Sequence, residues 1–143
     1  MPTDRLRHQG RSPSRRDRPR VLLVGSDDVD ARIDLMRRLR DEFDVAAAGT
    51  APALAARFEE NGFAYHHFPL HRGSSPLRDL RTLGALCLLL GRLRPDVVHT
   101  FDTKICVYGR LAARAAGVPV VLGTIPGLGS LYSDNTARYA TAM

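Results

Sequence analysis

The segment PDVVHTFDTK, residues 95–104, decides how the chain folds. It begins with Val97 and Val98, an apolar pair typical of a strand that is buried on both faces in a parallel sheet. It then turns polar within a few residues and carries His99, Asp102 and Lys104, the only lysine in the sequence. The segment therefore predicts a core strand whose carboxyl end brings polar groups to the surface.

Similar apolar runs recur along the chain and alternate with segments of helical periodicity. We expect strands at about 20–25, 43–48, 63–68, 96–101 and 118–124. Neighbouring strands are too far apart in sequence to form hairpins, so they should run parallel with helices between them. The sequence predicts an α/β fold: a Rossmann-like, doubly wound parallel sheet with helices on both faces.

Helix end signals support this alternation. Asp30 is the expected N-cap of the first helix, Pro52 should start the second helix, and Gly62 should end it. A last helix in YSDNTARYATAM should begin after Ser133 or Asp134, and it reaches the end of the sequence with no C-cap and no following strand. We therefore expect a truncated domain.

The length of 143 residues suits one domain, and the net charge of +6 is concentrated at its start. Residues 1–20 hold seven arginines against two aspartates, which gives +5 and leaves the remainder nearly neutral. Because residues 1–19 have almost no apolar side chains, we expect a disordered basic tail there. Contact with an anionic membrane and a solubilising leader without a partner both stay open. A nucleic-acid partner is not expected, since no aromatic residues are interleaved to stack on bases.

Several features indicate a cytoplasmic protein. The longest apolar stretch, Leu83 to Gly91, is far shorter than the ~20 residues that span a bilayer. No apolar segment follows the basic tail as it does in a secretory signal. Cys87 and Cys106 lie in apolar contexts without metal-ligand spacing, as buried reduced thiols do. A peripheral location at the inner face of the plasma membrane is a further expectation that rests on the tail alone.

Four loops should meet at the carboxyl edge of the sheet, where ligands bind in open parallel folds. They are GSDDVD at 25–30, FPLHRGSSP at 68–76, HTFDTK at 99–104 and GTIPGLGS at 123–130. In the last loop, Gly127 and Gly129 predict either a backbone that closely approaches a phosphate or a simple tight turn.

Other ligand classes fit these loops poorly. A dinucleotide site needs G-x-G-x-x-G after the first strand, but Gly25 is followed by Ser26 and two aspartates that would repel a pyrophosphate. The aspartate pair resembles a bacterial receiver domain, yet no acceptor aspartate ends the third strand. His66 and His67 point to opposite faces of a strand and have no cysteine or acidic partner nearby. We therefore expect no metal site.

The stretch RPDVVHTFDTKICVYGRLAARAAGVPVVLGTIPGLGSLYS resembles the N-terminal domain of family 4 glycosyltransferases of the GT-B fold. The likeness is greatest to bacterial enzymes that extend polysaccharide units on a lipid carrier, and it extends upstream to about Arg20. The resemblance implies an acceptor-binding domain, paired in the family with a second domain that holds a nucleotide sugar. It further implies retaining hexosyl transfer, with no cofactor beyond the nucleotide-sugar donor.

Carried over by position, the resemblance implies an acceptor-facing set of six residues. They are Ser26, His99, Asp102, Lys104, Gly127 and Gly129. The lysine suits an anionic diphosphate linkage of an acceptor lipid, and the aspartate suits a sugar hydroxyl. No catalytic residue can be assigned from the pattern.

Two departures from the family pattern limit what the resemblance implies. Many relatives have a histidine in the turn after the fifth strand, where this chain has Pro126. No donor-binding segment follows, so we expect the isolated chain to be inactive and to need a companion chain with a donor domain. A non-catalytic, receiver-like binding or regulatory module with the same fold is the alternative.

Overall fold

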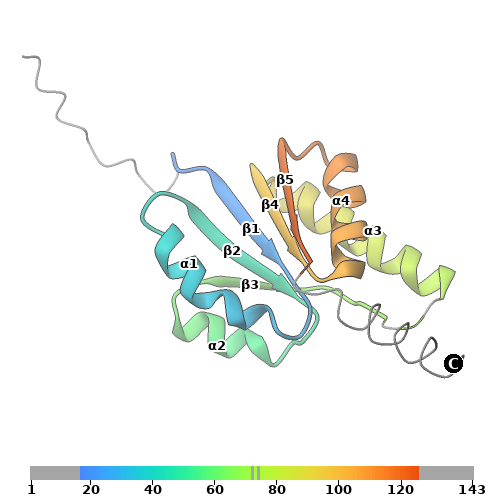
Figure 1. The fold of residues 1–143 in the computed structure, drawn as a ribbon, viewed down its shortest axis with the longest axis horizontal. Helices are drawn as coiled ribbons and strands as arrows, with labels where there is room; N and C mark the ends of the chain where they lie inside the picture. Colours follow the sequence, from blue (N-terminus) through green and yellow to red (C-terminus); the bar gives the residue numbers. More distant parts are fainter. Residues whose placement is uncertain (1–16, 72, 74, 126–143) are drawn as a thin grey trace, which may run out of the picture.

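The computed structural model describes residues 17–71, 73 and 75–125, which form one five-stranded parallel sheet between two layers of helices (Figure 1). The strands are β1 Arg20–Val24, β2 Asp44–Gly49, β3 Ala64–His67, β4 Val97–Phe101 and β5 Val120–Thr124. The helices are η1 Val29–Arg32, a short 3₁₀ turn, α1 Ile33–Leu39, α2 Leu54–Glu60, α3 Pro76–Leu93 and α4 Thr103–Ala115. The fold class and all five strands predicted from the sequence are confirmed.

The strand order is β3-β2-β1-β4-β5, so the chain starts in the middle of the sheet and builds outward in both directions. β1 is therefore paired on both sides, and Leu22 lies beside Ala46 of β2 and Val98 of β4. The winding direction reverses between β1 and β4, which is the place where open α/β sheets bind ligands. The loops that follow β1 and β4 flank this switch point.

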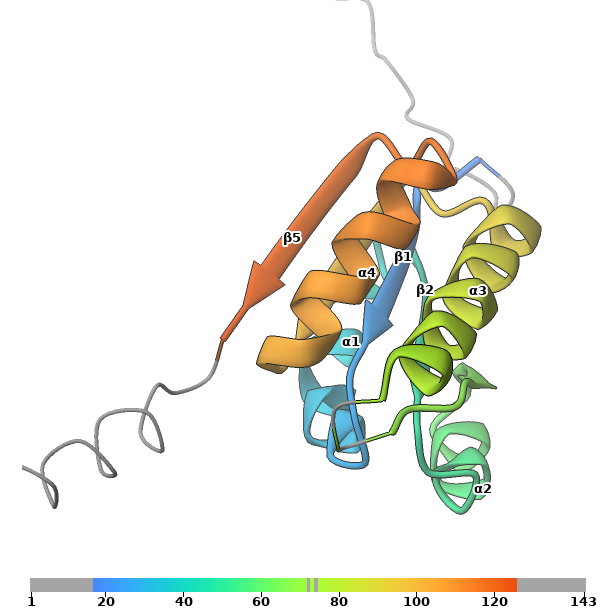
Figure 2. The same cartoon turned by 90° about the vertical axis from the view of Figure 1, so that its right-hand side faces the viewer.

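Alternating side chains divide the core into two halves. On one face, Leu23 and Phe101 pack with residues of α1 and α2 such as Met36. On the other, Val98 packs with residues of α3 and α4 such as Leu90 (Figure 2). The central strands β1 and β4 thus present successive residues to different helix layers, as strands buried on both faces must.

The helix ends follow the predicted signals only in part. Gly62 follows α2 as predicted, with a φ of 76° that a glycine adopts without strain, whereas α2 begins at Leu54, two residues after Pro52, which was expected to start it. Pro76 occupies the first turn of α3. The prediction that Asp30 caps the first helix is wrong, because Asp30 lies inside the 3₁₀ turn and pairs with Arg57 of α2.

The two helix layers cover the sheet unequally. α1 and α2 lie over β1, β2 and β3, while the same face of β5 is largely open, with Val120 and Leu122 44% and 49% exposed. The final helix predicted from the sequence falls outside the described residues. Within the described part, no helix is both long and apolar enough to cross a membrane.

The described chain begins within the predicted basic tail. Arg18 donates a hydrogen bond to the carbonyl of Arg40 at 2.8 Å, and the carbonyl of Pro19 accepts one from the backbone N–H of Asp44 at 3.0 Å. Residues 18 and 19 therefore contact the folded domain. Residues 1–16 lie outside the described part, and disorder there stays a prediction.

Candidate functional site

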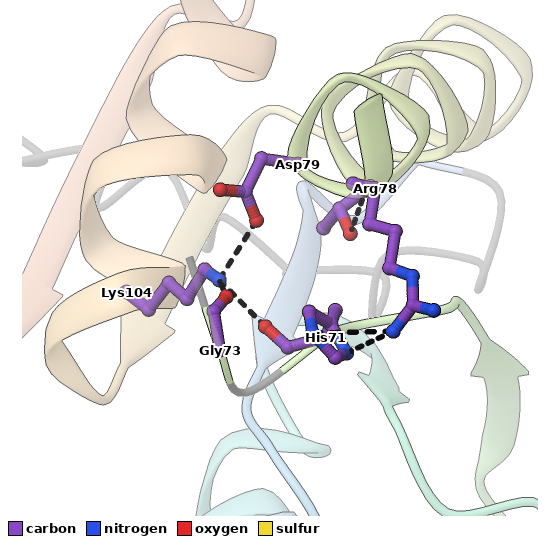
Figure 3. A network of polar contacts seen from close by, with 6 residues as sticks. His71, Gly73, Arg78, Asp79 and Lys104 are labelled. Carbon is purple, nitrogen blue, oxygen red and sulfur yellow. Dashed lines mark hydrogen bonds and ion pairs between the residues drawn. The ribbon is translucent and has the colours of Figure 1, made fainter. Parts of the chain in front are cut away.

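The side chains of His99 in β4 and Lys104 at the start of α4 lie on opposite sides of the sheet. Val98 faces α3 and α4, so its neighbour His99 faces the opposite side of the sheet. There the His99 ring packs on Phe101, with 4.2 Å between the ring centroids. Lys104, in the first turn of α4, instead points at α3 (Figure 3). The predicted cluster is therefore divided between two environments.

Lys104 is the centre of a closed network of polar contacts (Figure 3). Its Nζ donates to the carbonyl oxygens of His71 and Gly73, the latter at 2.9 Å, and forms an ion pair with Asp79 Oδ1 at 2.8 Å. An ammonium group has three N–H donors, so these contacts use all of them. Lys104 therefore fastens the connection between β3 and α3 to the start of α4.

Asp79 is a residue that the sequence analysis missed. The Lys104 ammonium, chiefly through its hydrogen bond, lowers the pKa of the Asp79 carboxyl, and the Tyr108 hydroxyl contributes in the same direction. In the sequence, Asp79 reads as an ordinary acidic residue in a first helical turn, which the helix dipole favours. Only the packing of α3 against α4 reveals its partner.

His99 lies in a partly apolar environment on the other face. Its Nε2 shares a hydrogen bond with Thr124 Oγ1 at 2.9 Å. Burial lowers the pKa of His99 below its usual range, and the nearby Arg32 guanidinium adds to the effect. The imidazole is therefore neutral at pH 7, able to hydrogen-bond a hydroxyl but carrying no charge for an anion.

Arg32 completes this second cluster, and the sequence analysis did not single it out. Its guanidinium carbon lies 4.6 Å from the centre of the Phe101 ring, a cation–π contact. The position of Arg32 in the sequence could have indicated it, because η1 directly follows the loop after β1, and this loop lies at the switch point. Residues 30–60 hold five arginines, all on helical or turn segments, and the sequence alone offered no way to choose Arg32 among them.

Ser26 and Asp102 lie in the two loops beside the switch point. Ser26 Oγ donates to Asp28 Oδ1 at 3.0 Å. Asp102 precedes α4 with φ 79° and ψ 145°, a conformation that costs free energy for any residue with a Cβ, and its side chain makes no capping hydrogen bond. A half-buried carboxylate held in a strained conformation is a feature of functional loops.

Gly127 and Gly129 lie outside the described residues, so their predicted role stays untested. Within the described ranges, no group of three or more His, Cys, Asp or Glu side chains is placed to hold a metal ion. Cys87 and Cys106 are free thiols and only partly buried.

Together, the sheet and the polar loops at its switch point define a Rossmann-like domain of the GT-B type. The family follows from residues 33–141, which match the model of the Glycosyl transferase 4-like domain. Because this match covers more than half of the sequence, the chain belongs to that family. The family resemblance is confirmed, and it favours the transferase interpretation over the receiver-like alternative.

One curated relative is a UDP-Gal:alpha-D-GlcNAc-diphosphoundecaprenol alpha-1,3-galactosyltransferase from Escherichia coli, 43% identical over 58 residues. The match covers 41% of this chain and 15% of the relative. The chain thus corresponds to a small part of that enzyme.

Among solved structures, the calicheamicin glycosyltransferase CalG4 matches with a TM-score of 0.62 and 16% identity, over 83% of this chain and 37% of CalG4. A UDP-N-acetylglucosamine 2-epimerase also matches with a TM-score of 0.62, at 22% identity over 82% of this chain and 35% of the epimerase. At such identities the likeness shows the fold alone.

Proposed function

We propose that this domain is the acceptor-binding half of a retaining glycosyltransferase. In this proposal a hexose passes from a nucleotide sugar to a lipid-linked glycan during polysaccharide biosynthesis. The observation that carries it is the set of polar side chains after β1 and β4, at the switch point of a family 4-like domain. The name of the Escherichia coli relative, which acts on a diphosphoundecaprenol-linked sugar, supports the choice of acceptor class.

The proposed acceptor contacts follow from the chemistry of each group. The Asp102 carboxylate accepts hydrogen bonds from sugar hydroxyls, while Ser26 and the neutral His99 exchange hydrogen bonds with them. Gly127 and Gly129 stay in the proposal as backbone donors. Lys104 enters it differently, because its three donors are engaged with the protein. It shapes the edge of the site through the β3–α3 connection.

The proposal also concerns what the domain works with. Transfer requires a donor-binding domain opposite the acceptor domain, and a companion chain is one proposed source of it. No cofactor beyond the nucleotide sugar and no metal is proposed. A cytoplasmic location, with the basic residues before Arg20 touching anionic lipid at the inner membrane face, completes the proposal.

The test is binding of a short-chain GlcNAc diphosphate lipid to the full chain, measured by NMR titration. Asp102→Asn is the informative variant, because asparagine tolerates a positive φ and the substitution removes only the charge. We expect a loss of affinity of roughly tenfold. Asp41→Asn, an exposed carboxylate before β2 at the opposite edge of the sheet, is the matched control.

Two results would contradict the proposal. The first is an acceptor that shifts no resonance after β1 or β4. The second is equal affinity for wild-type protein, Asp102→Asn and Asp41→Asn. A reconstituted enzyme with a donor domain then tests transfer itself, with the galactose of UDP-galactose as the label.

A further inference from the structure

Within the described part of the chain, Lys104 and Arg32 lie beside the switch point, and only Lys104 forms ion-pair or hydrogen-bond contacts there. All three donors of Lys104 are occupied. Within residues 17–71, 73 and 75–125, Arg32 has no hydrogen bond or ion pair, and its contact is with the Phe101 ring. A half-buried guanidinium has five N–H donors, so this one has unused capacity to bind a planar anion or a phosphate.

The groups around Arg32 are arranged to leave that capacity available. The nearest acidic residue in η1, Asp30, is paired with Arg57. Asp28 accepts the Ser26 hydroxyl, and both Asp27 and Asp28 are exposed, so water and salt screen the repulsion that these two carboxylates exert on a bound phosphate group. The Phe101 ring contacts the guanidinium group through a cation–π interaction, which uses none of its N–H groups.

An apolar strip lies next to this cation. His99 packs on Phe101, and Leu122 of β5 is its direct partner across the parallel ladder, so both face the open half of the sheet. Leu122 and Val120 are 49% and 44% exposed. The surface thus joins a cation with no hydrogen-bond or ion-pair partner among the described residues, a hydrogen-bonding imidazole and hydroxyl, and an exposed aliphatic strip.

We infer that Arg32 binds the phosphate-bearing group of an amphiphilic ligand, with His99 and Thr124 as neutral partners and Leu122 against its apolar part. The inference deepens the proposed function and rests on it for the identity of the ligand as an acceptor. It moves the anion contact from Lys104, on the α3 and α4 face, to Arg32 on the α1 and α2 face. The lowered pKa of His99 agrees, since a neutral imidazole leaves Arg32 as the charged group of this cluster.

The experiment uses the full chain and three probes: hexyl diphosphate, inorganic pyrophosphate and the uncharged hexyl glucoside. NMR titration should show hexyl diphosphate shifting the His99 side-chain and Leu122 methyl resonances. Arg32→Gln should weaken its binding roughly tenfold to a hundredfold, as loss of a charge-assisted contact does. The affinity of Arg32→Lys for hexyl diphosphate should lie between those of the wild type and Arg32→Gln, because lysine keeps the positive charge but lacks the planar guanidinium group that can donate two parallel hydrogen bonds.

Arg38→Gln is the matched control, since Arg38 is an exposed arginine on the neighbouring helix α1. It removes the same charge and should change affinity by less than about twofold, as screening of a distant surface charge predicts. Thermal unfolding of each variant checks the fold, and loss of one cation–π contact should lower the Tm only slightly. Equal losses in Arg32→Gln and Arg38→Gln would overturn the inference, as would no binding of hexyl diphosphate to the wild type.

The probes also separate the possible sources of the phosphate. Tighter binding of hexyl diphosphate than of pyrophosphate supports an amphiphile, while equal binding overturns the part assigned to Leu122. A GlcNAc diphosphate lipid that binds Arg32→Gln as well as wild type would sink the inference and leave the proposed function standing. Binding of hexyl diphosphate through Arg32, with no binding of the glycan acceptor, would support the phosphate contact at Arg32 and contradict the proposed function.

Discussion

At the switch point, the cationic side chains on the two faces of the sheet differ in how far their N–H donors are used by the protein. On the α3 and α4 face, Lys104 is enclosed by a carboxylate and two carbonyl oxygens. On the α1 and α2 face, Arg32 rests on an aromatic ring with its N–H groups unused by the described protein. The comparison teaches that a basic residue in a motif indicates a ligand only when its donors remain available.

The largest expected effect separates the faces by stability. Lys104→Ala removes two charge-assisted hydrogen bonds to carbonyl oxygens and leaves Asp79 without its cation. The hydrogen bonds alone predict a loss of about 1–3 kcal/mol in the free energy of unfolding, measured by urea denaturation. Arg32→Ala should cost less than about 1 kcal/mol. Equal costs for the two variants would break the comparison.

The second-largest expected effect on stability comes from Asp102, the strained residue that precedes α4. Asp102→Gly relieves a conformation that costs of order 1–3 kcal/mol for a residue with a Cβ, against an entropy cost of about 0.5–1 kcal/mol. We expect the free energy of unfolding to rise by roughly 1 kcal/mol, while acceptor affinity falls. Asp102→Val should destabilise, because a β-branched side chain tolerates this φ least. A less stable glycine variant would show that the loop is not strained.

The pH dependence of stability sharpens the comparison, because His99 and Asp79 titrate in different ranges. The pKa of His99 is lowered by burial and by Arg32, so the unfolded chain binds its proton first and stability falls as the pH drops below about 6.5. His66 adds to this loss, since burial and Arg92 lower its pKa. The lowered pKa of Asp79 stabilises the fold above about 3.9, and that contribution disappears only below this pH.

Urea titrations at a series of pH values measure both contributions. His99→Gln should reduce the slope between about pH 5 and 7 to the part that His66 contributes, and it should leave the acid limb intact. Asp79→Asn should flatten the acid limb alone. A change in the same range from both variants would mean that the faces are not independent.

The smallest effect concerns the N-terminus. Deletion of residues 1–16 should change the free energy of unfolding by no more than about 0.5 kcal/mol, as surface changes do. Arg18→Ala is the comparison, because Arg18 donates to the Arg40 carbonyl near the amino edge of the sheet. A deletion that costs more than Arg18→Ala would show that the earlier residues also pack on the domain.

The sheet could be predicted because its signals are local. Apolar runs and glycine stops placed each strand to within about two residues, and β4 was expected at 96–101 and lies at Val97–Phe101. The site could be predicted only in part. Alternation along a strand already separates His99 from Thr100, but the direction of Lys104 depends on the positive φ of Asp102 and the start of α4.

The missed residues share a physical reason. Asp79 and Arg32 gain their roles from partners distant in sequence, Lys104 and Phe101, which only the folded helices and strands bring together. Nothing local distinguishes either from an ordinary charged residue on a helical segment. Asp30 shows the same limit, since a predicted N-cap became the ion-pair partner of Arg57.

Because Lys104 is the only lysine, the folded chain offers amine-modifying reagents a single side-chain amine, and Asp79 and two carbonyl oxygens surround it. A side-chain nitrogen held in these three contacts is poorly placed to attack an acylating agent. Its modification should therefore wait for the β3–α3 connection to detach from α4. The rate at which one acetyl group is added to this side chain then becomes a direct measure of how often that edge of the domain opens.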